Sequence, residues 1–189
     1  LGLADRCIAS HHRDALLQQL IDARWGKGAD TDAHGVVNRI MRELEQTSQP
    51  VFAELEAPVY QHATLIRELM DHDSVEQIVA AIGAVKSENK WFNKAQKTLA
   101  HGSPVSIKLI DEQLKRAKHM SLAEVFQFEM ALSVQCCSHR EFPEGVRALL
   151  VDKDGQPAWT YPDVASVEQS FIDELLASPW ETSPLADLK

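Results

Sequence analysis

Hydrophobic residues recur at spacings of three and four along most of the chain, a pattern typical of amphipathic helices. The predicted helices begin near residues 10, 30, 65, 74, 88, 103, 121 and 166, and a shorter one begins at Pro143. Each stretch carries one apolar face and one polar face. The pattern therefore predicts an all-α fold, a compact array of about seven or eight helices.

Several of these starts carry residues that cap helices. Three sequences have the Ser-x-x-Glu/Gln spacing of a capping box: Ser74–Gln77, Ser121–Glu124 and Ser166–Gln169. Ser10 is a single N-cap candidate, and Gly102 stands where a C-terminal glycine cap belongs. These residues fix the expected helix boundaries more firmly than the apolar spacing does.

Two regions interrupt the helical pattern. The opening "LGLADRCIAS", residues 1–10, has the composition of a short strand, but no second strand is evident for it to pair with. Pro50 and Pro58 bracket a looser joint over residues 46–58, and residues 181–189 read as a tail. We expect an orphan strand whose sheet lies upstream, and the chain to be a piece of a longer protein.

Composition limits the possible functions. The 189 residues, 44% hydrophobic, predict one globular domain with a real core. Asp and Glu number 28 against 19 Lys and Arg, which argues against a nucleic-acid surface. No apolar run approaches the ~20 residues that span a membrane. The three cysteines form neither a disulfide framework nor a metal pattern, so we expect a cytoplasmic protein.

Motifs for catalysis are mostly missing. The chain has eight histidines, and one of them lies in the sequence Asp-His-Asp at Asp71–Asp73, the densest group of possible metal ligands. No HExxH or CxxC spacing accompanies this group, so we expect a solvated loop there and no metal. Cys136 or Cys137 with His139 resembles a nucleophile and base, although helix cysteines are more often core residues. No GxSxG, Walker or GxGxxG sequence is present, and we expect no cofactor.

A family resemblance begins after residue 102. "GSPVSIKL", "SLAEVFQFEMALSVQCC" and "FPEGVRALLVDKDGQPAWTYPDV" resemble the C-terminal part of the 3-hydroxyisobutyryl-CoA hydrolase group within the enoyl-CoA hydratase/isomerase (crotonase) superfamily. The opening "GLA" is similar to a strand that follows the catalytic core of that family. The resemblance divides the chain into residues 1–10, 11–101, where it is weak, 102–180, and the tail 181–189.

The resemblance implies a role without chemistry of its own. In this family the oxyanion-hole amides and catalytic carboxylates precede the segment matched here, so no catalytic residue is expected in this chain. The intact protein is implied to hydrolyse an acyl-CoA thioester in valine catabolism. These helices are implied to cover the acyl-CoA site and to make contacts in a homo-oligomer.

Three residues of the short helix and the following turn are implied to bind substrate. Lys153 matches a lysine that contacts the adenine or phosphate end of coenzyme A, Leu149 lies where an aromatic residue often packs on the adenine, and Arg147 is nearby. The sequence departs from the family pattern: leucine replaces phenylalanine, and one residue is inserted before the lysine. The alternatives are an ordinary exposed Lys153 and an Arg147 paired with Glu144.

Two other functional classes stay open. The parent enzyme is equally compatible with a hydratase or isomerase, since the discriminating carboxylates lie outside the chain. A freestanding helical module that binds a protein partner is the third reading. If a catalytic core is missing, we expect exposed apolar surface and self-association. We also expect Val146, Leu149 and Leu150 to be buried on one side of the short helix, and Asp154 with Gly155 to form a turn.

Overall fold

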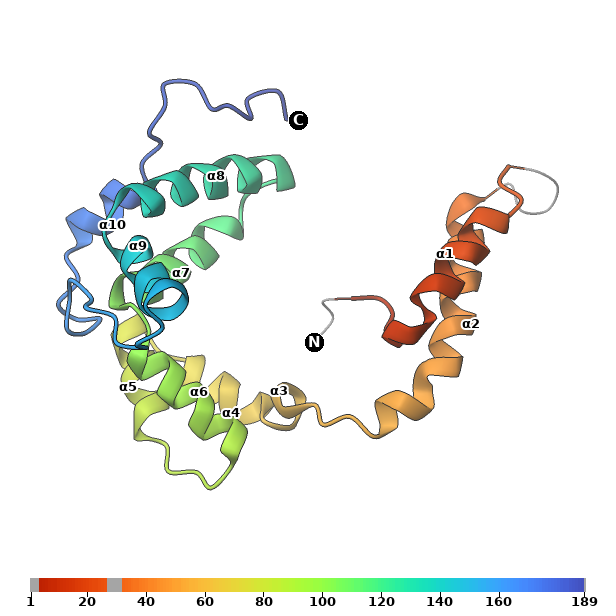
Figure 1. The fold of residues 1–189 in the computed structure, drawn as a ribbon, viewed down its shortest axis with the longest axis horizontal. Helices are drawn as coiled ribbons and strands as arrows, with labels where there is room; N and C mark the ends of the chain where they lie inside the picture. The colour runs from red at the N-terminus through yellow and green to blue at the C-terminus, as the bar shows by residue number, and fades with distance from the viewer. Residues whose placement is uncertain (1–3, 27–31, 189) are drawn as a thin grey trace. The chain divides into compact units, whose positions relative to one another are not determined.

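A computed structural model describes residues 4–26 and 32–188 (Figure 1). Within these ranges the chain forms helices and no strand, which confirms the all-α prediction. The α-helices of these ranges are α1 (Arg13–Asp22), α2 (Ala33–Ala53), α3 (Pro58–Gln61), α4 (Ala63–Met70), α5 (Val75–Ala84), α6 (Lys90–His101), α7 (Pro104–Ala117), α8 (Leu122–Ser138), α9 (Glu141–Val146) and α10 (Gln169–Leu176). Two further turns are a 3-10 helix, η1 (Ser10–His12), and a π-helix, η2 (Arg147–Val151).

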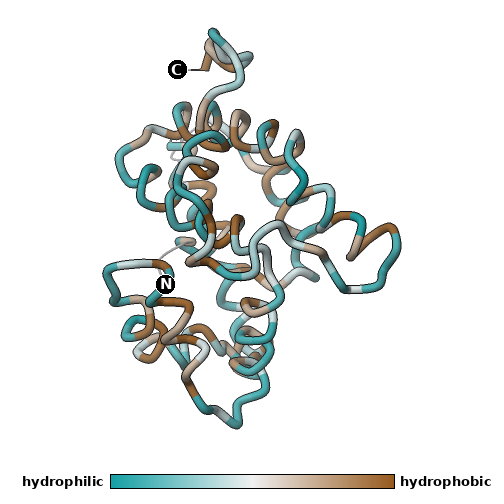
Figure 2. Tube along the Cα trace, turned by 90° about the vertical axis from the view of Figure 1, so that its left-hand side faces the viewer, coloured by the Kyte–Doolittle hydropathy of each residue, from teal (hydrophilic) through white to brown (hydrophobic). Residues whose placement is uncertain are grey.

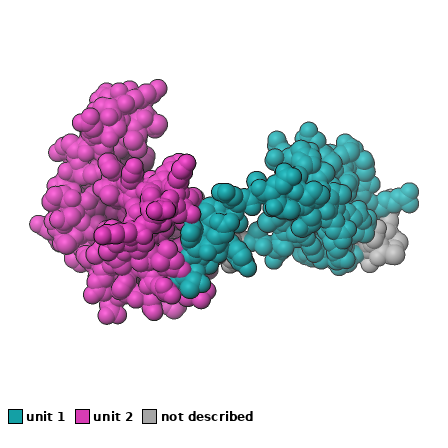
Figure 3. All heavy atoms as spheres, turned by 90° about the horizontal axis from the view of Figure 1, so that it is seen from below, with its two compact units in different colours: residues 1–64 teal, residues 65–189 magenta. Residues whose placement is uncertain are grey.

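The chain divides into two compact units, whereas its length alone predicted one domain. Unit 1 is Leu1–Thr64 and unit 2 is Leu65–Lys189 (Figure 3). Most helices of unit 2 contact one another, while α1 packs on α2 within unit 1. Each unit has its own buried cluster, so each is described separately below.

Unit 1 is a helical hairpin with a short core. Val36, Ile40 and Leu44 lie four residues apart on α2 and are buried, and Leu16 and Leu20 of α1 pack against them. The predicted stripe on α2 also included Val37, which is 38% exposed. A stripe spaced by four is narrower than the predicted face because only one helix covers it.

The first described residues attach to α2 through side chains and not through a sheet. Arg6 donates to Glu45 at 2.6 Å, the backbone N–H of Cys7 donates to Glu45 at 3.2 Å, and that of Ala9 donates to Ser48 at 2.9 Å. Residues 4–9 contain no strand, and residues 1–3 of the predicted strand lie outside the described residues. The hydrogen bonds that a sheet would supply come here from α2, in part.

Two boundaries in unit 1 differ from those predicted. Helix α2 continues through Pro50 to Ala53, where a joint was predicted. A proline so near the end of a helix removes one hydrogen bond without ending the buried face, and Ser48 two residues earlier is fully buried. Ser10 lies in η1 and makes no cap, and α1 ends at Asp22, not at Trp25. The second helix was predicted to start at residue 30 or 31, outside the described residues; its observed N-cap is Asp32.

Unit 2 is built around three helices. α10 contacts both α7 and α8. The core that they share consists of Val105, Leu109, Leu132, Val167, Ile172, Leu175 and Leu176. Ile172 is the most buried residue of this cluster and has no exposed surface. The C-terminal hydrophobic pattern therefore forms a core of its own.

Two of the three predicted capping serines are confirmed. Ser121 and Glu124 form the complete capping box, and Ser74 accepts from the N–H of Gln77. Ser166 does not cap α10: its N–H donates to Asp163 at 2.8 Å, and the helix begins only at Gln169. The hydroxyl of Ser166 also donates to the carbonyl of Asp163 at 2.7 Å, so this serine is engaged in its own local turn and does not cap α10.

Apolar side chains remain exposed on the α7–α8 hairpin. Ile110 and Leu114 of α7 and Leu122 and Phe126 of α8 are each more than half exposed, the largest value being 72% at Leu122. Each pair is spaced by four residues, so it lies on one face of its helix. Figure 2 shows hydrophobic and hydrophilic positions interspersed along the chain. We had expected exposed apolar surface, and these four residues, here called the hairpin patch, provide it.

Candidate functional site

The candidate site is the turn that follows α9 and η2, residues 152–156. Lys153 has φ 57° and Gly155 has φ 62°, so the chain adopts the left-handed conformation twice within three residues. This confirms the predicted turn at Asp154 and Gly155. Among non-glycine residues that the structure describes, only Lys153 has a positive φ. That conformation is uncommon for residues with a Cβ and persists only when neighbouring contacts impose it.

The turn is preceded by a π-helix, η2. The N–H of Asp152 donates to the carbonyl of Arg147 at 2.8 Å, five residues earlier. A π-turn contains one residue more than an α-turn and is common at functional sites. One residue, Asp152, separates the end of this π-helix from Lys153.

The π-turn also overturns the burial predicted for this helix. Leu149 and Leu150 are 62% and 67% exposed, whereas Ala148 is fully buried. The prediction assumed a repeat of 3.6 residues, and a π-turn changes the angle between successive side chains. Val146 is half-buried, in closer agreement with the prediction.

Arg147 is the hub of the turn. Its Nε and Nη2 donate to the two carboxylate oxygens of Glu144 at 3.0 and 2.8 Å. Its Nη1 donates to Asp152 at 2.6 Å and to Asp154 at 2.7 Å, and Nη2 also donates to the carbonyl of Gln156 at 3.1 Å. A guanidinium has five N–H donors, and all five are used. The pairing of Arg147 with Glu144 is confirmed, and it is one part of a larger network.

The network is strongly polarised. Hydrogen bonds from Arg147 and from the N–H of Ala158 lower the pKa of Glu144 to about 2. Arg147, together with the N–H of Gln156, also lowers the pKa of Asp154. The pKa of Arg147 is raised by the same three carboxylates. Glu144, Asp154 and Arg147 are therefore ionised at neutral pH, and the bidentate Glu144 pair has the geometry that makes such contacts strong.

Lys153 lies between the two anchored aspartates. It is exposed, and no hydrogen bond or ion pair to its side chain is found among the described residues. The two carboxylates beside it, Asp152 and Asp154, are both bonded to Arg147. The ammonium group is thus available to an anion, as the resemblance implied.

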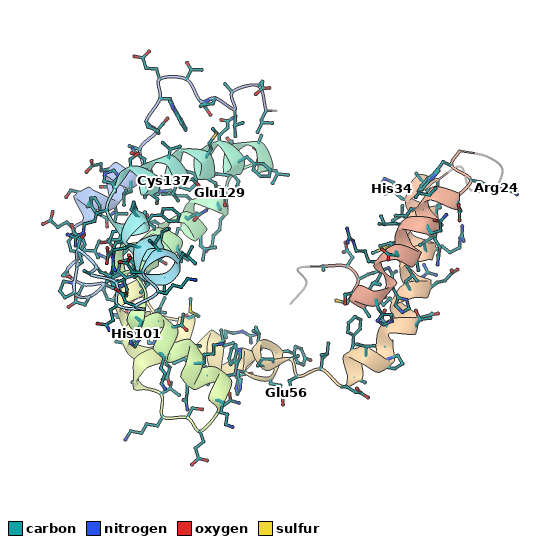
Figure 4. The ribbon with its side chains drawn as sticks, in the orientation of Figure 1. Arg24, His34, Glu56, His101, Glu129 and Cys137 are labelled. Carbon is teal, nitrogen blue, oxygen red and sulfur yellow. The ribbon has the colours of Figure 1, made fainter. Side chains whose placement is uncertain are left out.

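Leu149 borders an open groove of about 400 Å³. The groove is lined by Lys97, Thr98, His101, Gly102, Leu149, Gly155, Pro157 and Trp159. His101, labelled in Figure 4, ends α6, and its carbonyl accepts from the indole N–H of Trp159 at 3.0 Å. The structure therefore brings Leu149 together with an apolar, aromatic wall, while Arg147 faces its own carboxylates.

Two residues that the sequence analysis did not propose for the site, Glu141 and Trp159, fix the segment after the turn to other parts of unit 2. Glu141 is only 7% exposed; it accepts from Ser103 at 2.6 Å and from the N–H of Thr160 at 2.7 Å. Trp159 packs so closely on Gly145 that a Cβ there would lie 3.2 Å from the indole ring. The signal in the sequence was the spacing Glu141, Glu144, Arg147, which places all three on neighbouring turns.

The cysteines do not form a nucleophilic site. All three are free, and Cys136 packs against the core of unit 2. Burial raises the pKa of Cys136, which favours the unreactive thiol. The ring of His139 is engaged by the carbonyl of Gln135 at 2.7 Å and by Glu174 at 3.4 Å. Cys136 is thus a core residue as predicted, but Cys137 on α8, labelled in Figure 4, is exposed.

The described residues offer neither a metal site nor a membrane span. Within residues 4–26 and 32–188 no three His, Cys, Asp or Glu side chains converge as a metal site would require, and this includes Asp71–Asp73. In the same ranges, no helix has the length and apolar character needed to cross a membrane.

The chain matches a known protein family over most of its length. A family model described as enoyl-CoA hydratase/isomerase matches residues 1–176. The chain is therefore a member of the enoyl-CoA hydratase/isomerase family. This agrees with the resemblance seen in the sequence and extends it over residues 11–101, where the resemblance was weak.

Individual relatives narrow the comparison. The chain is 32% identical over 178 residues, 94% of its length, to a protein of Danio rerio named 3-hydroxyisobutyryl-CoA hydrolase, mitochondrial. It is 29% identical over 171 residues to small ribosomal subunit protein mS47 of Arabidopsis thaliana, covering 88% of the chain. A crystal structure of a carnitinyl-CoA dehydratase from Mycobacterium thermoresistibile has the same fold over 95% of the chain, with a TM-score of 0.69 and 24% identity.

The chain spans less than half of each of these proteins. It covers 44% of the Danio rerio hydrolase, 41% of mS47 and 46% of the dehydratase chain. The similarity to the solved structure establishes the fold of this part, and the activity of a whole protein lies beyond it.

The prediction of a cytoplasmic location is wrong. The Danio rerio relative is named mitochondrial, and three further relatives carry the same word in their names. Cysteine usage can distinguish an oxidising compartment from a reducing one, but it cannot distinguish the cytoplasm from another reducing compartment. Composition therefore had no means of locating the protein.

Proposed function

We propose that the chain is the helical C-terminal part of an acyl-CoA thioester hydrolase that resembles 3-hydroxyisobutyryl-CoA hydrolase. In this proposal its helices cover the acyl-CoA site, and Lys153 contacts a phosphate of coenzyme A. The observation that carries it is the similarity to the Danio rerio hydrolase along 94% of the chain. The exposed Lys153, next to aspartates that already accept hydrogen bonds from Arg147, supports the phosphate contact.

The test uses the product of the full reading frame. Release of free coenzyme A from 3-hydroxyisobutyryl-CoA, followed with a thiol reagent, is expected; hydration of an enoyl-CoA is not. Lys153→Ala is expected to raise KM for the coenzyme A thioester about tenfold, as loss of one charge-assisted hydrogen bond does. On a pantetheine thioester, which lacks the nucleotide, the variant and the parent protein should be equal.

Two alternatives have their own outcomes in this assay. Enoyl-CoA hydration without thioester release would identify a hydratase or isomerase parent. The similarity to a protein named as a ribosomal subunit favours a second candidate, a protein that binds a partner and turns over no thioester. Inactivity of the full-length product on both substrates would support that candidate.

The hairpin patch is proposed to contact a neighbouring subunit or the catalytic body. Four large apolar side chains on two consecutive helices are each more than half exposed, and exposed apolar surface is a mark of interaction sites. Light scattering across a concentration series should show association, and a Leu122→Ser/Phe126→Ser double variant should reduce it. A monomer at every concentration would count against this contact.

A further inference from the structure

We infer that Arg147 is a positioning residue: it holds the 152–156 turn so that Lys153 is presented, with its flanking carboxylates hydrogen-bonded to the guanidinium, to a phosphate of coenzyme A. The inference rests on the proposed function for the identity of the ligand. It assigns to Arg147 an indirect role, in place of the direct substrate contact that the family resemblance implied.

The first step is that Arg147 has no donor left for a ligand. Its five N–H groups reach Glu144, Asp152, Asp154 and the carbonyl of Gln156, at distances between 2.6 and 3.1 Å. A direct phosphate contact would have to break one of these bonds. The arginine is therefore saturated by the protein itself.

The second step is that these bonds enclose Lys153. Asp152 and Asp154 precede and follow the lysine, and both are tied to the same Nη1 atom. The N–H of Gly155 donates to the carbonyl of Ala148 at 3.0 Å, which closes the turn on η2. With both neighbours fixed, the backbone of Lys153 is held at φ 57°. Its left-handed conformation is thus imposed by contacts that converge on Arg147.

The third step is electrostatic. Without Arg147, Lys153 would be one cation between two free carboxylates, which repel an approaching phosphate. Glu144 fixes the guanidinium from the other side and is the more covered partner, with 11% of its side chain exposed against 51% for Asp152. The network therefore supplies the shape of the turn and offsets part of its negative charge.

Two variants separate positioning from direct binding. Arg147→Met removes the donors and keeps the length of the side chain, and Arg116→Met is the matched control. Arg116 is also on the surface of unit 2, with a single long ion pair of 3.9 Å to Glu112. All variants are made in the full-length protein.

The first readout does not depend on function. An endoproteinase that cleaves only after lysine is used, since replacing Arg147 then leaves the set of cleavage sites unchanged. Arg147→Met is expected to speed cleavage after Lys153 about tenfold relative to cleavage after Lys86, an exposed lysine between α5 and α6. Arg116→Met should change neither rate. Equal rates in Arg147→Met and the parent protein would overturn the inference.

The second readout is calorimetric binding of free coenzyme A. Arg147→Met and Lys153→Ala are each expected to weaken binding about fivefold to tenfold, and the double variant is expected to lose no more than either single one. Binding of pantetheine should be unchanged in all variants. Penalties that multiply in the double variant, or an equal loss for pantetheine, would overturn the inference, because Arg147 would then act directly or only through stability. A full-length protein that binds coenzyme A in this way but cleaves no thioester would refute the proposed hydrolase and leave this inference standing.

Discussion

The core of unit 2 offers a quantitative test of the fold. Ile172 has no exposed surface and lies among Val105, Leu132 and Leu175 in the cluster shared by α7, α8 and α10. Ile172→Ala removes three carbons, worth about 0.8 kcal/mol each in burial. A residual cavity adds to this, so we expect a loss of about 3 kcal/mol in the free energy of unfolding, within the range measured for such changes.

The assay is chemical unfolding followed by circular dichroism and tryptophan fluorescence, with thermal melting as a second measurement. At about 4 °C per kcal/mol for a unit of this size, the melting temperature should fall by about 12 °C. Ile110→Ala is the matched control, since Ile110 belongs to the hairpin patch and is 57% exposed. It should change the free energy of unfolding by less than about 0.5 kcal/mol. A loss below about 1 kcal/mol for Ile172→Ala, or equal losses in both variants, would refute the assigned core.

Three further predictions concern Glu144, the α8 cap and the π-turn. The pKa of Glu144 is about 2 in the folded chain against 4.5 ordinarily, so its ionised form stabilises the fold above pH 4.5 and this contribution is lost as the pH falls toward 2. Glu144→Gln should therefore be less stable than the parent protein at neutral pH and approach it in acid; a constant difference between urea midpoints would contradict this. Ser121→Ala breaks the capping box and should lower the free energy of unfolding, measured in urea, by about 1 kcal/mol. Ser133→Ala, on the exposed side of the same helix, should leave it unchanged. Deleting the exposed Leu150 should convert the π-turn to an α-turn and change the free energy of unfolding by no more than about 1 kcal/mol. Deleting Ser133, by contrast, rotates the rest of α8 by about 100° and should unfold unit 2, as followed by circular dichroism.

Some features of the candidate site were accessible from the sequence. The turn at Asp154 and Gly155 follows from turn chemistry, and the pairing of Arg147 with Glu144 follows from their spacing of three. The bonds from Arg147 to Asp152 and Asp154 were not predicted, because they depend on how a π-turn directs the chain back. Sequence patterns assume an α-helical repeat, and one extra residue in a turn is enough to invalidate them.

The sequence by itself determined which stretches are helical and how several of them begin. Apolar spacing marked the stretches that form α7, α8 and α10 and gave the buried face of α10, and Ser74 and Ser121 cap their helices through contacts only three residues away. Such contacts join residues that are close in sequence, so they can be predicted from the sequence alone.

Tertiary structure decided everything that required a distant partner. It divided the chain into two units, left the hairpin patch exposed, and tied the first described residues to α2 through Glu45 and Ser48, 38 and 39 residues away. Burial and hydrogen bonding are settled by which groups meet in space, and the same local pattern is compatible with several such meetings.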